Sequence, residues 1–132
     1  MLSKTNSNPR TILLAAACWN YLAAGAGLMV GVSAEFARAV GMRGHTDSLS
    51  WELFAACVLV FGIGYQWAAK DPQSHRDLIT LGTIGKPLVF AACMWNFYLG
   101  KAPGRIALGS VVDLLFGLVF LHFLMASRQR MS

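Results

Sequence analysis

Four long runs of apolar residues divide this chain, and they constrain its fold more than any other feature. Residues 11–34 and 53–69 carry no charge, while residues 78–100 and 106–127 carry one charge each, Lys86 and Asp113. A helix needs roughly 20 residues to cross the ~30 Å hydrocarbon core of a bilayer. Charged residues make up only 13% of the chain, against ~25% in an ordinary soluble domain. The runs therefore predict an all-α integral membrane protein, a transmembrane four-helix bundle with up-down-up-down topology in the lipid bilayer.

The same runs set the expected boundaries. We predict a polar N-terminal tail over residues 1–10, a four-helix transmembrane domain over 11–127 and a basic C-terminal tail over 128–132. The first helix is expected over residues 11–32, with Asn8-Pro9 interpreted as a helix stop. The longest connection should hold a short interfacial helix from Glu35 to Val40, closed by Gly41, and then a loop over residues 45–50 that caps the second span.

The second and third spans are joined by a short charged segment that we interpret as a tight hairpin. Asp71 is a good N-cap and Pro72 suits the first helical position, so the third helix is expected to begin at Pro72, with His75 on its first turns. Small residues let membrane helices approach closely. The glycines expected to pack helices together are Gly27, Gly31, Gly62, Gly64, Gly82, Gly85, Gly109 and Gly117.

Lys86 is the most informative polar residue, because a charge at mid-bilayer costs about 2.5–3.5 kcal/mol. We predict that its ammonium faces the first or last helix rather than lipid. A helix rise of 1.5 Å per residue puts Lys86 and Asp113 roughly 10 Å deep from opposite membrane surfaces. The candidate buried polar or ligand-binding residues are Lys86, Tyr65, His122, Asn20 and Asp113, the last reached through water, with the Thr83 carbonyl as a further acceptor and Asn96 as a partner of Asp113.

Two interpretations of Lys86 stay open at this point. A structural lysine would snorkel or pair with a neighbouring helix, and Lys86→Met would then leave the bundle folded or stabilise it, since a buried charge is costly. A functional lysine would line a polar pocket that receives a ligand.

Several function classes find no support in the residue pattern. The chain lacks a nucleophile motif, a phosphate-binding loop and metal-ligand spacing, so we predict no catalytic residue and no metal site. The net charge of +5 is scattered over the helix ends, which is typical of membrane spans and not of a nucleic-acid partner. More of these basic residues fall on the side of the termini, which predicts that both termini are cytoplasmic.

The segment from Gly62 to Pro87 and the run VVDLLFGLVFLHFL resemble small bacterial four-helix membrane proteins of largely uncharacterised function. A Gly-x-Gly-Tyr turn, an Ala-Ala-x-Asp-Pro hairpin, a Gly-Lys step and an Asp in the last helix carry the resemblance. These proteins are similar in size and topology to the DoxX-like group, some of which are implicated as membrane subunits of quinone-linked oxidoreductases. The resemblance implies a bacterial inner (cytoplasmic) membrane location.

Two classes of function remain, and a third is less well supported. The chain is expected to be an accessory or scaffold subunit of a larger membrane complex, through other membrane subunits or self-association. Alternatively, it binds a lipophilic ligand such as a quinone among its helices. A small transporter is the weaker third reading, with only a faint similarity between residues 16–22 and 91–99 to suggest a duplicated two-helix unit.

Overall fold

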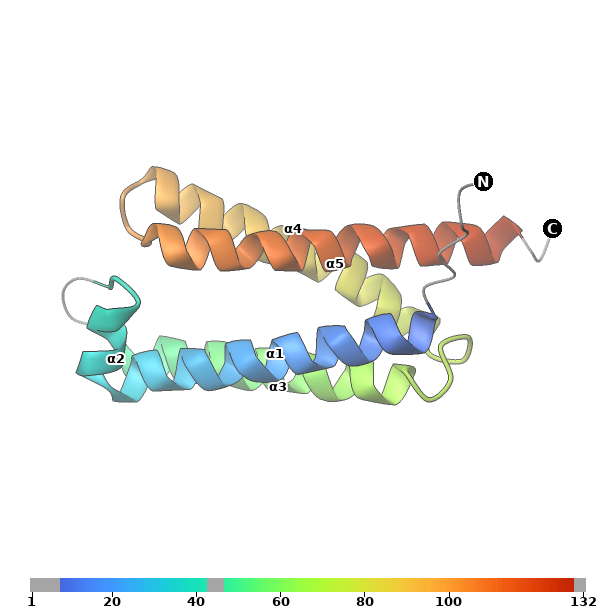
Figure 1. Cartoon of the computed structure of the whole chain (residues 1–132), viewed down its shortest axis with the longest axis horizontal. Helices are drawn as coiled ribbons and strands as arrows, with labels where there is room; N and C mark the ends of the chain where they lie inside the picture. The colour runs from blue at the N-terminus through green and yellow to red at the C-terminus, as the bar shows by residue number, and fades with distance from the viewer. Residues whose placement is uncertain (1–7, 43–46, 130–132) are drawn as a thin grey trace.

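The structure is a computed structural model, and it describes residues 8–42 and 47–129. This part of the chain forms α1 (Pro9–Val32), α2 (Ala34–Ala39), α3 (Ser48–Ala68), α4 (Arg76–Tyr98) and α5 (Gly104–Gln129). The helices α1, α3, α4 and α5 are each long and apolar enough to cross a membrane. They run up-down-up-down, with the start of α1 and the end of α5 at the same end of the molecule (Figure 1). The predicted all-α four-helix bundle of a multi-pass membrane protein is confirmed.

The four long helices pack as two pairs. α1 lies along α3, and α4 lies along α5, whereas α3 and α4 share a much smaller contact. Figure 1 shows α4 leaving the end of α3 at an angle and crossing toward the far end of α5. The predicted hairpin between these two helices is therefore short at its connection, residues 69–75, but its arms diverge.

This pairing agrees with a two-helix unit, but the matching sequence segments do not occupy equivalent places. Trp19 and Asn20 lie near the middle of α1, whereas Trp95 and Asn96 lie in the last turn of α4. The similarity between residues 16–22 and 91–99 therefore relates two different depths along the helices.

The start of α1 differs from expectation. The helix begins at Pro9, two residues early, and the Asn8 side chain accepts a hydrogen bond of 3.1 Å from the backbone N–H of Arg10. An N-cap Asn followed by Pro at the first helical position is a start signal, so interpreting it as a stop was wrong. The short helix α2 lies where it was predicted, and Gly41 follows it with a φ of +94°, a value that favours glycine.

The connection between α3 and α4 also corrects the prediction, because α4 begins at Arg76 and not at Pro72. The Asp71 carboxylate accepts hydrogen bonds from the Ser74 hydroxyl at 2.5 Å and from the N–H groups of Gln73 and Ser74 at 3.2 Å. Asp71 therefore caps a separate turn that contains Pro72, and His75 closes it with Nδ1 3.0 Å from the Asp71 carbonyl oxygen. The hydrogen bonds, led by that from the Ser74 side chain, lower the pKa of the Asp71 carboxyl.

Most of the predicted packing glycines lie where another helix comes close. A Cβ atom at Gly82 would sit 2.5 Å from the Tyr65 hydroxyl, and one at Gly117 would sit 3.0 Å from Pro87 Cδ. Gly64 is in ordinary contact with Leu78. On the α1–α3 interface the glycines oppose aromatic side chains: Gly27 meets Phe54, Gly31 meets Trp51, and Gly62 meets Tyr21. No atom of the described residues lies within 4 Å of a Cβ placed at Gly85 or Gly109, so these two do not pack as predicted.

The contrast between Gly82 and Gly85 on the same helix gives a matched test of packing. Gly82→Ala should destabilise the bundle by about 1–3 kcal/mol, because the new methyl group overpacks against the buried Tyr65 ring. Gly85→Ala should be neutral or stabilise by up to about 1 kcal/mol through helix propensity. Unfolding of the purified protein in mixed micelles measures both, and equal effects of the two substitutions would contradict this packing.

Candidate functional site

Lys86 lies inside the bundle, where it joins three helices. From α4, its Nζ atom donates to Asp113 Oδ1 of α5 at 2.6 Å and to Asn20 Oδ1 of α1 at 2.9 Å. Only 5% of the lysine side chain and 17% of the aspartate side chain are exposed. The predicted inward orientation of the ammonium, toward the first and last helices, is confirmed.

Two further hydrogen bonds extend these contacts, and one of them adds α3. The Asn20 amide donates to the Val58 carbonyl of α3 at 3.2 Å, and the Trp19 indole N–H donates to Asp113 Oδ2 at 3.4 Å. We call Trp19, Asn20, the Val58 carbonyl, Lys86 and Asp113 the four-helix polar network. Each of the four long helices contributes to it, and both carboxylate oxygens of Asp113 accept a bond.

Aromatic rings complete the surroundings of the ammonium. The Lys86 Nζ atom lies 5.5 Å from the ring centroids of both Tyr65 and Phe116. Aromatic faces attract a cation at this distance, most strongly where water is excluded. Tyr65 is itself buried and packs edge-on against Phe120, with ring centroids 5.2 Å apart. The ammonium is thus held by two oxygen acceptors and two aromatic rings.

Small residues one helical turn away make the network possible. Gly62 follows Val58 by four residues on α3, Gly82 precedes Lys86 by four on α4, and Gly117 follows Asp113 by four on α5. Residues four apart lie on the same face of a helix. Each glycine therefore brings a neighbouring helix close beside a polar group that must reach across.

The direct contact between Lys86 and Asp113 corrects the prediction that water would join them. The expected depths were counted from two separate membrane surfaces. Counted instead from the α4–α5 connection, Lys86 lies roughly 18 Å from the end of α4 and Asp113 roughly 14 Å from the start of α5. The lysine stem spans the remaining few ångströms.

Other predicted partners of the buried charges lie elsewhere. His122 is exposed on α5, outside the network. Asn96 is also exposed, and its amide donates to the Ala92 carbonyl of its own helix rather than to Asp113. The Lys86 ammonium donates to Asn20 and Asp113 and not to the Thr83 carbonyl, which was the other predicted acceptor. Asp71, Pro72 and His75 form the α3–α4 connection at the end of the molecule and do not belong to this site.

A small cavity borders the network. Its volume is about 90 Å³. Typical ligand pockets are larger, ~300–1,000 Å³, and a water occupies ~30 Å³ in the liquid. The cavity is therefore of a size for about three waters rather than for a quinone with its isoprenoid tail. Its lining is mostly apolar and consists of Asn20, Ala23, Phe54, Val58, Phe61, Tyr65, Gly85, Lys86, Val89 and Asp113.

Sequence reasoning missed Trp19 and the Val58 carbonyl. An indole N–H near the middle of an apolar helix needs an acceptor, so Trp19 beside Asn20 was a usable signal. A backbone carbonyl has no such signal.

Within the described residues, no group of three His, Cys, Asp or Glu side chains is placed to hold a metal ion. A comparison of the chain with known protein families, characterised proteins and solved structures found no match.

The ion pair reverses the expected effect of Lys86→Met. Removing the lysine alone leaves the Asp113 carboxylate unpaired, so Lys86→Met and Asp113→Leu should each destabilise the bundle by about 3–5 kcal/mol. The double variant Lys86→Met/Asp113→Leu removes both charges and should recover most of that loss. Unfolding free energies in mixed micelles complete the double-mutant cycle, with Lys70→Met, at an exposed cation, as the control.

Additive single effects, with no recovery in the double variant, would mean that the two residues do not stabilise the fold as a pair.

Proposed function

We propose that this integral membrane protein is a non-catalytic accessory subunit that packs against other subunits of a larger membrane complex. The observation that carries the proposal is that the polar groups at the centre of the bundle are all hydrogen-bonded and leave only a small cavity beside them. In the described part of the chain, no buried side-chain nitrogen or oxygen lacks a hydrogen-bond partner. The Lys86–Asp113 ion pair at the centre joins α4 to α5, and the adjoining cavity is small.

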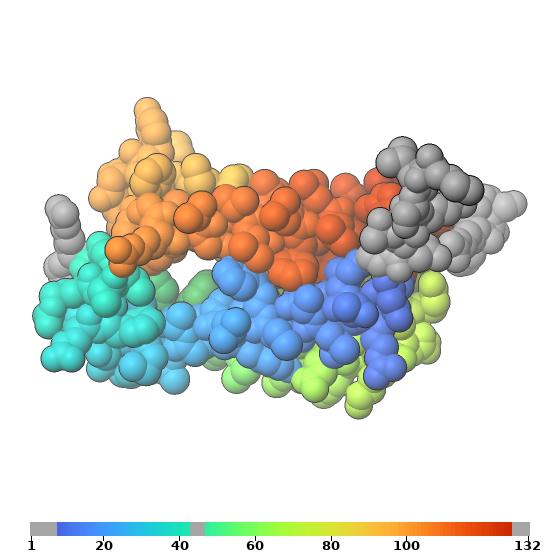
Figure 2. Space-filling model, in the orientation of Figure 1, coloured from blue at the N-terminus to red at the C-terminus, as the bar shows by residue number. Residues whose placement is uncertain are grey.

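The outward face of α1 supports the same proposal. Ala15, Cys18, Gly25 and Ala26 are exposed on it around the larger Leu22, and outside the backbone of α1 no described atom lies within 4 Å of a Cβ placed at Gly25. Figure 2 shows α1 lying open on the front of the molecule. Small residues allow a further membrane helix to approach closely, with dispersion and lipid release favouring the contact. The partner is therefore a membrane helix of another subunit.

Purification from the native membrane tests this proposal. We expect the chain to co-purify with a larger membrane complex in a fixed ratio. Gly25→Leu should abolish that association by blocking the face of α1 without destabilising the bundle. Gly109→Leu, the same change at a glycine of α5 that also has open space beside it, is the matched control and should retain the complex. Recovery of the wild-type chain alone, in a mild detergent that preserves other complexes, would contradict the proposal.

A quinone-binding function is the second candidate, because one observation favours it. The cavity beside the network brings an ammonium and a carboxylate together with the aromatic side chains of Phe54, Phe61 and Tyr65. A quinone carbonyl would accept a hydrogen bond from Lys86, but the cavity would first have to enlarge. Organic extraction of the same preparation distinguishes the two functions, since stoichiometric prenylated quinone in a chain purified alone would favour quinone binding.

The resemblance to the DoxX-like group makes redox or energy-converting complexes the first partners to examine. Transport remains the third candidate. A transporter would have to break and re-form the Lys86–Asp113 pair between two states. The buried, fully hydrogen-bonded pair therefore favours transport least of the three functions.

We further propose a bacterial inner membrane location with both termini in the cytoplasm. In the sequence, six basic residues fall on the side of the termini and four on the opposite side, and this excess supports the orientation. A C-terminal reporter that is active only in the cytoplasm should therefore be active. Activity from a periplasm-specific reporter, with silence from the cytoplasmic one, would reverse the orientation.

A further inference from the structure

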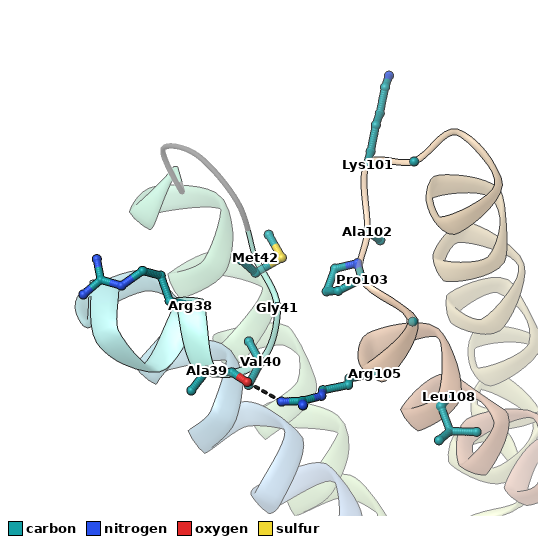
Figure 3. Close-up of a pocket in the computed structure, with 12 residues that line it drawn as sticks. Arg38, Ala39, Val40, Gly41, Met42, Lys101, Ala102, Pro103, Arg105 and Leu108 are labelled. Atoms are coloured by element: carbon teal, nitrogen blue, oxygen red, sulfur yellow. Dashed lines mark hydrogen bonds between the residues drawn. The ribbon is translucent and has the colours of Figure 1, made fainter.

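A second and larger cavity lies at the end of the molecule away from the termini. Its volume is about 740 Å³, within the ~300–1,000 Å³ range of ligand pockets. Residues 38–42, from the end of α2 onward, form one wall, and residues 100–105 with Leu108 form the other. Figure 3 shows these two segments facing each other across the cavity. The cavity therefore lies between the α1–α3 pair and the α4–α5 pair.

Among the described residues, the charged side chains that line this cavity are all cations. They are Arg38, Lys101 and Arg105, and no acidic residue of the described part of the chain lines it. Arg105 donates from Nη1 to the carbonyl oxygen of Ala39, so its guanidinium bridges the two walls. In Figure 3 the side chains of Arg38 and Lys101 start from opposite rims and point away from the space between the walls, so each would have to turn inward to contact a ligand. The first turn of α5 adds the positive end of a helix dipole beside Arg105.

The position of the cavity indicates where its ligand comes from. It opens where two membrane spans end, beside the connection between α4 and α5. In the last turn of α4, Trp95 and Tyr98 are stacked with ring centroids 6.1 Å apart, and they are 62% and 81% exposed. Exposed Trp and Tyr mark the level of the lipid headgroups. The cavity is thus at headgroup depth, with the apolar Leu108 among its lining residues.

We propose that this cavity binds the phosphate of an anionic phospholipid headgroup. The phosphate would lie beside Arg105, with Arg38 and Lys101 turned inward from the rims, because guanidinium and ammonium groups are the usual donors to phosphate oxygens. A headgroup held there would contact both helix pairs at the end of the molecule farthest from the termini. The proposal is independent of the accessory-subunit function, since it rests on a different site.

Native mass spectrometry of the purified full chain, titrated with phosphatidylglycerol or phosphatidylcholine, tests the proposal. The wild-type protein should bind phosphatidylglycerol more tightly. Arg38→Gln/Lys101→Gln keeps the Arg105–Ala39 bond and should weaken phosphatidylglycerol binding about fivefold for each cation removed. Lys70→Gln, at the opposite end of the molecule, is the matched control and should bind like wild type.

Equal affinity for the two lipids, or unchanged phosphatidylglycerol affinity in the double variant, would overturn the proposal. Inorganic phosphate is the third probe. If it competes with phosphatidylglycerol and stabilises the lipid-free protein equally well, the site takes free phosphate and the lipid assignment is wrong. If the double variant folds poorly, the binding of the two lipids and of inorganic phosphate to the wild-type protein still tests the proposal.

Discussion

The contact between the Lys86 ammonium and the Asp113 carboxylate is the interaction on which the arrangement of the bundle depends. In a bilayer, apolar side chains gain little by leaving lipid for protein, so close packing and polar contacts decide which helices associate. α1 with α3 and α4 with α5 form pairs by close packing at glycine positions. Lys86 and Asp113 neutralise each other within the α4–α5 pair, because an unpaired charge in hydrocarbon is costly. Their hydrogen bonds to Asn20 and Trp19 of α1 then join this pair to the α1–α3 pair. The four-helix polar network thereby holds the two pairs in one relative position.

The glycines and the polar network depend on each other. The Lys86–Asp113 contact of 2.6 Å requires α4 and α5 to lie close together, and Gly117 against Pro87 provides that approach. Contacts at the two ends support the same geometry. Arg76 donates to the Ser127 hydroxyl at 2.7 Å near the termini, and Arg105 joins the two pairs at the opposite end.

Sequence patterns were sufficient for the features that the membrane itself dictates. Bilayer thickness sets the length of an uncharged span, so four spans followed from the apolar runs, and the cost of a buried charge turned Lys86 inward. The partner of Lys86 was harder to predict from sequence. It depends on which helices are neighbours and on how far each one is shifted along the bundle axis. The Val58 carbonyl could not be foreseen, since every residue carries one. Asp71 was recognised as a cap, but the same residue type caps a turn or a helix, which is why the start of α4 was misplaced.

The distance between the Lys86 side-chain nitrogen and the Asp113 carboxyl carbon, measured by solid-state NMR in lipid bilayers, tests the direct ion pair. Protein labelled with ¹⁵N-lysine and ¹³C-aspartate suffices, with Asp113→Asn to assign the signal. We expect strong dipolar dephasing of one buried lysine ammonium, lost in the variant, because nitrogen and carboxylate are in direct contact. A lysine ammonium that shows no coupling to any carboxylate, and cross-peaks to lipid headgroups instead, would contradict the claim that this ion pair lies at the centre of the polar network.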